Sequence, residues 1–354
     1  MAYTTIDNGE EHFSAVTYTG TGSSRSITGL EFGPDWVWIK RRNGAYSHYL
    51  YDSTRGTGKQ LYAEKTDAEA TDNTEVTAFN SDGFSLGSGS GTNENTNTQV
   101  AWCWKANGGT TSSNSNGSIT STVQANTTAG FSIVTYVSNN TEGATFGHGL
   151  SLAPDLVIVK GRDSADNWAV FNGTSTTNSR SLHLDTTDGE IPVSSYNFWN
   201  LYWDETRPSS TVVTLGVDAK VNKSGNENFV AYCFHSVQGY SKIGKYIGNG
   251  NADGPFIYTG FKPALVIAKR TDGNGNDWRI ADNKRDPFNI VDGRIKINSS
   301  DAEDSSDQFD FLSNGFKVRT TAGDLNGTSG HAFFYIAFAE HPFVSSKGVP
   351  VTAR

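Results

Sequence analysis

The chain has 354 residues, of which 35% are hydrophobic and 12% aromatic, and this length suits two or three domains better than one. The formal net charge of −9 and the two cysteines exclude a strongly basic nucleic-acid-binding protein and a disulfide framework. The sequence contains no run of about 20 apolar residues, which excludes a membrane-spanning helix, and its polar start does not resemble a secretory signal.

Short apolar and aromatic runs alternate with Gly, Asn, Ser and Thr along the chain, a pattern typical of antiparallel strands joined by turns. One such run occurs three times, at residues 34–40 (PDWVWIK), 154–160 (PDLVIVK) and 263–269 (PALVIAK). Each run begins with proline, which a strand tolerates at its first residue. The repetition predicts three copies of one fold.

A second shared strand closes each copy, at residues 100–104 (VAWCW), 230–234 (VAYCF) and 336–340 (IAFAE). Because side chains alternate across a strand, one face carries large residues such as Trp102 and Trp104, and the other carries small residues such as Cys103. We expect the large face to fill the interior of its own copy and the small face to contact a neighbouring layer. The predicted fold class is all-β, with three tandem antiparallel β-sandwich domains of jelly-roll or lectin-like type.

The predicted boundaries follow from the spacing of these strands. Copy one is residues 1–107, copy two is residues 119–238 and copy three is residues 239–344. Residues 108–118 are rich in Gly, Ser and Asn and are expected to form a plain linker, and residues 345–354 form a C-terminal tail. The short second joint predicts that copies two and three pack closely, with copy one at an angle.

Two loops in copy three place oxygen-bearing side chains at alternate positions, as a calcium site requires. The candidate ligands are Asn249, Asn251 and Asp253 in one loop, and Asp272, Asn274 and Asn276 in the other. Neither loop has a glutamate at its closing position. Hairpin turns are the more frequent use of such residues, so we expect no metal and no cofactor, with calcium as the alternative.

Catalytic residues are not expected. The acidic loops at residues 66–72 and 300–307 correspond to each other in copies one and three, and repetition favours a structural role over a glycosidase pair, which needs two carboxylates across a cleft. The seven histidines form no metal-binding spacing. Cys103 and Cys233 are expected to be buried and inert, at a position that copy three fills with Ala339. We therefore predict that the protein is not an enzyme.

Copy two contains an unusual aromatic run at residues 196–203 (YNFWNLYW). One tryptophan is expected to pack in the core. The candidate ligand-binding residues are Phe198, Trp199, Tyr202 and Trp203, because exposed rings can stack on sugars. The alternative is that this run docks on a neighbouring domain or subunit.

The sequence resembles a family of virion proteins from marine tailed phages, those that infect cyanobacteria and abundant marine α-proteobacteria. The resemblance rests on the motifs described above and on residues 1–6 (MAYTTI), 51–56 (YDSTRG), 80–84 (NSDGF), 258–266 (YTGFKPALV), 336–343 (IAFAEHPF) and 350–354 (PVTAR). It covers nearly the whole chain. Because the repeated domain of that family has no assigned function, the resemblance implies a location in the virion and no site residues.

The resemblance and the lack of catalytic motifs together predict a structural protein on the surface of a phage particle. We expect part of a tail fibre or receptor-binding appendage that contacts a host surface glycan or protein. The alternatives are a capsid or head decoration without a host ligand and, less favoured, a depolymerase that cuts host glycan. The expected partners are other virion proteins and further copies of the chain in a homo-oligomer, with no nucleic acid and no membrane insertion. The protein would be made in the host cytoplasm.

Overall fold

The computed structural model describes residues 3–175, 180–191 and 202–351. Within these residues every strand ladder is antiparallel, which confirms the all-β class. In the described part of the chain, three short helices interrupt the strands: η1 (Gly9–Glu11), α1 (Ser90–Asn93) and α2 (Ala219–Asn222). No helix among the described residues has the length and apolar character needed to cross a membrane.

In copy one a six-stranded sheet faces a three-stranded sheet. The larger sheet has the order β1 (Phe13–Thr19), β9 (Thr98–Trp104), β3 (Trp36–Arg41), β4 (His48–Asp52), β5 (Lys59–Tyr62) and β6 (Ala70–Thr71). The smaller has the order β2 (Arg25–Thr28), β8 (Gly83–Leu86) and β7 (Val76–Asn80). Apolar residues from both sheets, including Val37, Phe84 and Cys103, pack together between the two layers.

Copy two repeats this strand order. Its larger sheet runs through β12 (Phe131–Val137), β18 (Asn228–Phe234), β14 (Leu156–Gly161), β15 (Ala169–Asn172) and β16 (Leu182–His183). Two further strands, β11 (Ser121–Asn126) and β10 (Ser112–Asn114), extend the sheet beyond β12. The second layer consists of β13 (Ala144–Gly147) and β17 (Val212–Leu215).

Copy three has the same order in one continuous eight-stranded sheet. The strands are β19 (Ser241–Ile247), β26 (Ala332–Pro342), β21 (Phe261–Arg270), β22 (Arg279–Asp282), β23 (Val291–Lys296), β24 (Asp304–Leu312), β25 (Gly315–Val318) and β20 (Phe256–Tyr258). Because β23 pairs with β24, the sheet curls back on itself in a near-closed, barrel-like form. Pro263 lies at a register shift in β21, where the strand pairing is already irregular.

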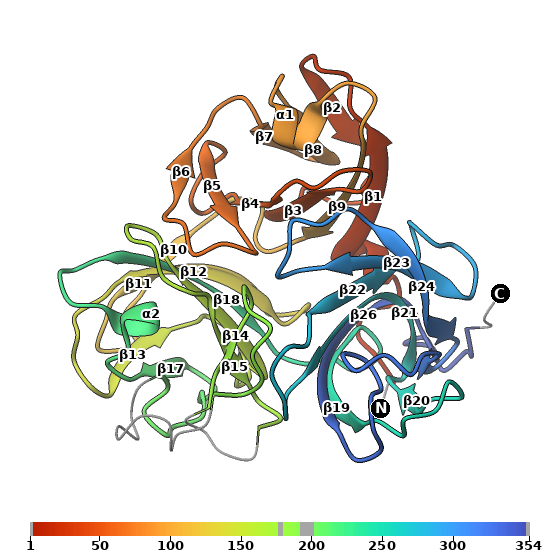
Figure 1. Cartoon of the computed structure of the whole chain (residues 1–354). Helices are drawn as coiled ribbons and strands as arrows, with labels where there is room; N and C mark the ends of the chain where they lie inside the picture. Colours follow the sequence, from red (N-terminus) through yellow and green to blue (C-terminus); the bar gives the residue numbers. More distant parts are fainter. Residues whose placement is uncertain (1–2, 176–179, 192–201, 352–354) are drawn as a thin grey trace.

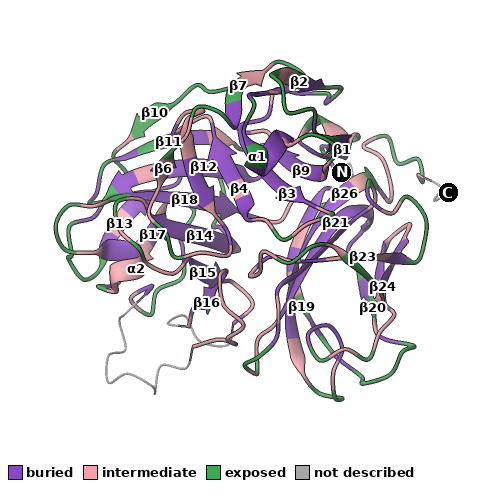
Figure 2. Ribbon diagram, turned by 45° about the horizontal axis from the view of Figure 1, so that its top comes forward, coloured by how far each residue is buried: buried purple, intermediate pink, exposed green. Residues whose placement is uncertain are grey.

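The three copies lie around a common centre, which gives the molecule a three-lobed outline (Figure 1). One buried cluster draws side chains from all three larger sheets. Phe338 of copy three contacts both Trp104 of copy one and Phe234 of copy two, with ring centroids 5.8 Å apart in each pair. The purple core strands of the three lobes surround this region in Figure 2. Copies two and three pack closely, and copy one packs against both of them in the same centre.

The prediction for the closing strand is wrong in one respect. Within the shared run, the large side chains at residues 100, 102 and 104, 230, 232 and 234, and 336 and 338 point into the shared centre, whereas the small ones between them point into the interior of their own copy. Earlier in β18 and β26, Phe229, Phe333 and Tyr335 also point into the interior of their own copy. In addition, pairing with β21 places Phe338 opposite Leu265, as Trp104 lies opposite Trp36. The residue of copy three that is equivalent to Cys103 is therefore Ala337 and not Ala339. Because side chains alternate along a strand, a shift of two residues leaves each side chain on the predicted face of the strand.

Residues 108–118, the predicted linker, include strand β10, which pairs with β11. The segment is also tied to copy one at its start. The buried carboxylate of Asp35 accepts hydrogen bonds from the backbone amides of Ala106, Gly108 and Gly109, at 2.7 to 3.0 Å. The joint is therefore part of the folded body, because its backbone groups find partners on both copies.

Candidate functional site

Hydrogen bonds between the copies repeat in cyclic order. Strands β3, β14 and β21 each contribute a fully buried lysine whose Nζ donates to a backbone carbonyl of another copy. Lys40 donates to Ser300 at 3.2 Å, Lys160 to Thr66 at 2.9 Å, and Lys269 to Thr187 at 3.0 Å. Copy one thus bonds copy three, copy two bonds copy one, and copy three bonds copy two.

The surroundings of these three lysines do not favour a catalytic role. Burial lowers the pKa of Lys40, Lys160 and Lys269 to about 8. Each Nζ also donates to a carbonyl of its own copy, that of Arg41, Asp166 or Asn276 respectively. Because each Nζ is enclosed and bonded to two carbonyls, the arrangement suits a structural bridge rather than a nucleophile that must reach a substrate.

A ring nitrogen makes a second cyclic set of contacts. Trp168 donates from Nε1 to the carbonyl of Tyr62 at 2.9 Å, and Trp278 donates to that of His183 at 2.8 Å. In copy one the equivalent residue is His48, whose Nε2 lies 3.0 Å from the carbonyl of Lys296. His48 begins β4, and Trp168 and Trp278 directly precede the equivalent strands β15 and β22, which places all three side chains at the border with the next copy.

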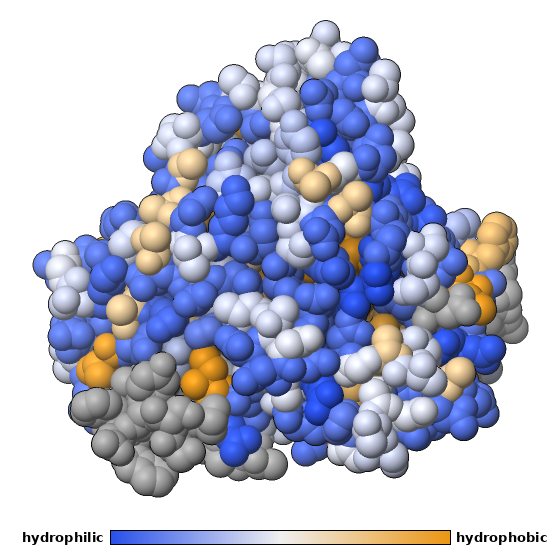
Figure 3. Space-filling model, viewed as in Figure 1, coloured by the Kyte–Doolittle hydropathy of each residue, from blue (hydrophilic) through white to orange (hydrophobic). Residues whose placement is uncertain are grey.

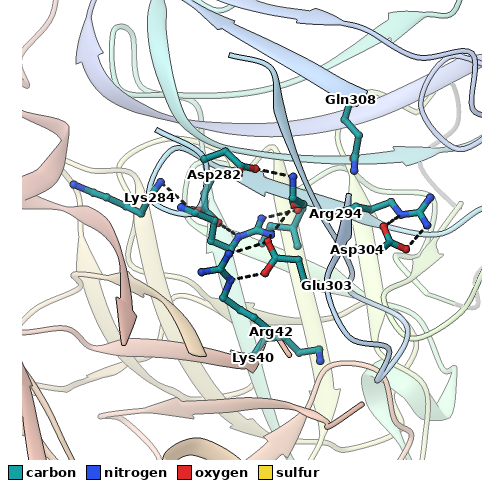
Figure 4. Close-up of polar contacts among 12 residues, drawn as sticks. Lys40, Arg42, Asp282, Lys284, Arg294, Glu303, Asp304 and Gln308 are labelled. Carbon is teal, nitrogen blue, oxygen red and sulfur yellow. Dashed lines mark hydrogen bonds and ion pairs between the residues drawn. The ribbon is translucent and has the colours of Figure 1, made fainter. Parts of the chain in front are cut away.

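Two buried charged clusters lie at the borders between copies. The Asp282 cluster, consisting of Asp282, Arg285, Glu303, Arg42 and Trp102, joins copies one and three. Figure 4 labels Asp282, Glu303 and Arg42 of this cluster. Arg285 Nε donates to Asp282 at 2.6 Å, and Trp102 Nε1 donates to the same carboxylate at 2.9 Å from the other copy. Glu303 lies between Arg42 and Arg285 and bonds both.

The Asp52 cluster, consisting of Asp52, Arg55, Glu69, Arg162 and Tyr232, joins copies one and two in the same way. Arg162 binds Glu69 with two contacts of 2.9 Å, and Arg55 Nη1 reaches the same carboxylate at 2.9 Å. Tyr232 Oη donates to Asp52 at 2.7 Å. Although burial acts to raise it, the two arginines hold the pKa of Glu69 below its ordinary value.

The border between copies three and two lacks this charge pattern. Asn172 and Ser175 replace the aspartate and the first arginine, Ile336 replaces the aromatic donor, and Thr271 replaces the second arginine. The backbone contact remains, because Glu190 N donates to the carbonyl of Thr271 at 2.8 Å, as Glu69 N donates to that of Arg162. The three borders therefore share one backbone geometry, although at this border Glu190 pairs with Arg180 of its own copy instead of with two arginines.

The acidic loops at residues 66–72 and 300–307 thus provide Glu69 and Glu303, the central carboxylates of the two clusters. Each is bonded by two arginines. A general acid needs a raised pKa and access to substrate, and the lowered pKa of Glu69 is the opposite of that requirement. Sequence reasoning assigned a structural role to these loops but missed their arginine partners, of which Arg162 and Arg42 lie on another copy.

The calcium candidates are engaged in turn geometry. Asn249 Oδ1 accepts from the amide of Asn251, and Asn251 Oδ1 accepts from the amide of Asp253, each at 2.9 Å. Asp253 pairs with Lys317. In the other loop Asp272 pairs with Arg270 at 2.7 Å, Asn274 Oδ1 accepts from Gly189, and Asn276 Nδ2 donates to loop carbonyls. For every candidate except Asn276, these contacts engage at least one of the side-chain oxygens that a cation would need. In the described part of the chain no three His, Cys, Asp or Glu side chains form a metal-binding group.

The aromatic candidates do not form an exposed platform where they are described. Tyr202 and Trp203 are buried in the core of copy two, with 6% and 1% of their surface exposed. The prediction of exposed rings is wrong for these two residues, because Trp203 packs against Phe171 and Tyr202 bonds His183. Phe198 and Trp199 lie outside the described residues.

Cys103 and Cys233 are buried free thiols, as expected. Burial raises the pKa of Cys233 to about 12 and that of Cys103 further still. A thiol with a raised pKa is a poor nucleophile at neutral pH. Both side chains belong to the interior of their own copy.

Among the described residues, two of the hollows on the surface lie against copy one. One, of about 280 Å³, lies along β1 and is lined by residues 14–17 and 29–31, together with Glu10 and Lys284. The other, of about 290 Å³, lies beside Pro34 and is lined by Asp35, Ser53, Gly108, Gly109 and residues 79–81. The shared centre encloses only about 20 Å³ among apolar side chains, which suits packing and no ligand. The face of the molecule shown in Figure 3 is mostly hydrophilic.

Comparison with known protein families finds one match. A model described as a domain of unknown function (DUF7483) matches residues 8–342. The chain belongs to the DUF7483 family. The match extends across all three copies and the borders between them, so this family corresponds to the whole three-lobed body. No curated protein and no solved structure matches the chain.

Proposed function

We propose that this DUF7483 protein is a non-enzymatic structural protein of three tandem β-sandwich domains on the surface of a phage particle. In this role it forms part of a tail fibre or receptor-binding appendage and contacts a host surface glycan or protein. The observation that carries the proposal is the use of the buried charged residues. The Asp52 and Asp282 clusters and the three lysines bond one copy to another, which supports a rigid scaffold rather than a catalytic centre.

A rigid scaffold suits attachment because its loops can vary without disturbing the core. The outward loops are polar and rich in Gly, Asn, Ser and Thr. Many copies on one particle would multiply a weak contact into firm attachment. The sequence resemblance to marine phage virion proteins supports the same location.

The test is to label intact particles of a phage that encodes the chain with an antibody against the purified protein. Labelling of the tail, together with attachment of the purified protein to host cells and inhibition of infection, is the expected result. Absence of the protein from purified particles would contradict the proposal.

A capsid or head decoration is the second candidate. The compact three-lobed body favours it, since a fibre shaft is usually elongated (Figure 1). A decoration protein would label the head, bind empty capsids and raise their resistance to heat, without attachment to host cells. The depolymerase alternative predicts release of sugars from host envelope, lost in a single Asp or Glu variant.

A further inference from the structure

The three copies differ at one edge of the larger sheet. In copy two the chain covers strand β12 with its own strand β11, in a ladder that pairs Val123 with Val134 and Gln124 with Ile133. The equivalent strands β1 and β19 are the last strands of their sheets. An uncovered edge strand presents backbone groups that can pair with another chain.

Copy three protects this edge in other ways. β19 carries Lys242 and Lys245, and lysine on an edge strand discourages pairing. Lys242 also donates to the carbonyl of Tyr258 at 2.8 Å. The space beside Gly260 is filled by Tyr3, whose hydroxyl donates to the Gly260 carbonyl at 2.9 Å.

The edge of copy one has neither kind of protection. β1 reads FSAVTYT and contains no charged residue, no proline and no glycine. The residues before it form η1, which packs closely on β26 of copy three and does not pair with β1. In copy two, by contrast, the preceding residues turn back and become β11.

The 280 Å³ hollow lies where an added strand would pack. In copy two β11 covers Gly149, and an added Cβ there would lie 2.5 Å from Val123 Cγ1 and 3.2 Å from Ala125 Cβ. The equivalent Gly29 lines the hollow, and an added Cβ there would meet nothing within 4 Å. Val134, which pairs with Val123 of β11, is completely buried, whereas its equivalent Val16 in β1 is only half-buried.

A polar contact made by β11 also has a counterpart near the edge of copy one. In copy two Gln124 of β11 donates from Nε2 to Ser53 and Thr54 of copy one, each at 2.9 Å. The equivalent residues for copy one are Asn283 and Lys284 of copy three. Asn283 Oδ1 is buried and has no hydrogen-bond partner among the described residues, whereas Lys284 lines the hollow, cannot accept a hydrogen bond and is paired with Glu10 at 2.8 Å. An amide in the added strand would satisfy Asn283.

We propose that the open edge of β1 accepts an extended strand from another polypeptide, in the way that β12 accepts β11. The strand that fits has a small apolar residue facing Gly29 and Leu30, followed by an amide facing Asn283 and a second small residue, as in the Val-Gln-Ala order of β11. Backbone pairing supplies affinity and the alternate side chains supply selectivity. The inference is independent of the proposed function, because strand binding can be measured on the isolated chain and does not require a phage.

The test uses a synthetic peptide of residues 119–127, which contain β11, and the full-length protein. Hydrogen exchange and fluorescence anisotropy measure whether the peptide binds and where. We expect saturable binding that slows amide exchange in residues 13–17. Absence of binding at millimolar peptide, or binding without protection of β1, would overturn the proposal.

Two variants sharpen the result. Val16→Lys places a charge in the hollow and should weaken peptide binding by at least about tenfold, or 1.4 kcal/mol. Thr19→Lys adds the same charge on β1 outside the predicted pairing and should leave binding unchanged. A peptide with Val123→Asp tests the same contact without altering the protein.

Equal binding by both protein variants and both peptides would contradict the proposed register. Self-association is the other outcome to measure. If the peptide-free chain forms dimers in solution and Val16→Lys abolishes them, the occupant of the edge is a second copy of this chain, and the proposal of a separate partner strand is wrong.

Discussion

At the residue scale, His48 illustrates how a buried side chain joins two copies while remaining neutral. Its Nδ1 accepts from Trp38 Nε1 at 2.9 Å, so its Nε2 carries the proton and donates to the Lys296 carbonyl at 3.0 Å. Burial, reinforced by the charge of Lys40, lowers the pKa of His48 to about 3. Protonation would replace the Nδ1 acceptor with a second donor, which Trp38 cannot satisfy.

This residue predicts a pH dependence of stability. Because the folded pKa lies below the unfolded value of about 6.5, the unfolded chain binds the proton first and stability falls as pH drops from about 6.5 toward 3. One such group contributes a slope of at most about 1.4 kcal/mol per pH unit. Urea unfolding of the wild type and His48→Gln at several pH values checks this. The stability difference between them should shrink on acidification, and a constant difference would contradict the assignment.

At the element scale, strand ends and loops of one copy meet those of the next through charged pairs that are far apart in sequence. Arg162 and Glu69 are 93 residues apart, and Arg42 and Glu303 are 261 residues apart. The corresponding loops were recognisable from the sequence as repeats of each other. Their partners were not, because sequence spacing carries no information about which copy lies against which loop.

A double-mutant cycle on Arg162→Ala and Glu69→Ala should give a coupling free energy of about 1–3 kcal/mol, because the pair is largely buried and bonded twice. Lys65 and Asp67 offer a matched control, since they are exposed and 4.0 Å apart, and their coupling should lie near zero. Thermal or urea unfolding supplies the free energies. Similar coupling in the two pairs would show that the Asp52 cluster does not join the copies energetically.

At the scale of the whole molecule, the shared centre makes the three copies depend on one another. Trp36 of copy one stacks on Tyr232 of copy two with centroids 4.3 Å apart, and Phe13 stacks on Phe338 of copy three at 5.2 Å. A copy alone would expose its share of this centre to water. We therefore expect one cooperative unfolding transition rather than three.

Calorimetry tests this expectation through the ratio of the calorimetric to the van't Hoff enthalpy, which should be close to one. Trp36→Ala should lower the free energy of unfolding by about 3–5 kcal/mol and shift the whole transition. Phe288→Ala removes a ring that is 81% exposed and should change stability by less than about 0.5 kcal/mol. Separate transitions, of which only one responds to Trp36→Ala, would contradict a shared core.

The sequence by itself determined the all-β class, the threefold repetition and the face on which each side chain of the shared strands lies. These properties are local, since alternation along a strand and turn residues between strands depend only on neighbours in the chain. Tyr202 and Trp203 show the limit of such reasoning, because an aromatic run reads the same whether it is exposed or buried.

Only the tertiary structure decided what the apolar faces pack against. A face bearing Trp102 and Trp104 is equally compatible with the second layer of its own copy and with another copy. The second layer already brings Phe84 into the interior of copy one, so that side needs small residues such as Ala101 and Cys103. The large face therefore packs in the shared centre. The buried lysines and charged clusters find their partners at the borders between copies, because the packing of three copies around one centre places distant loops side by side.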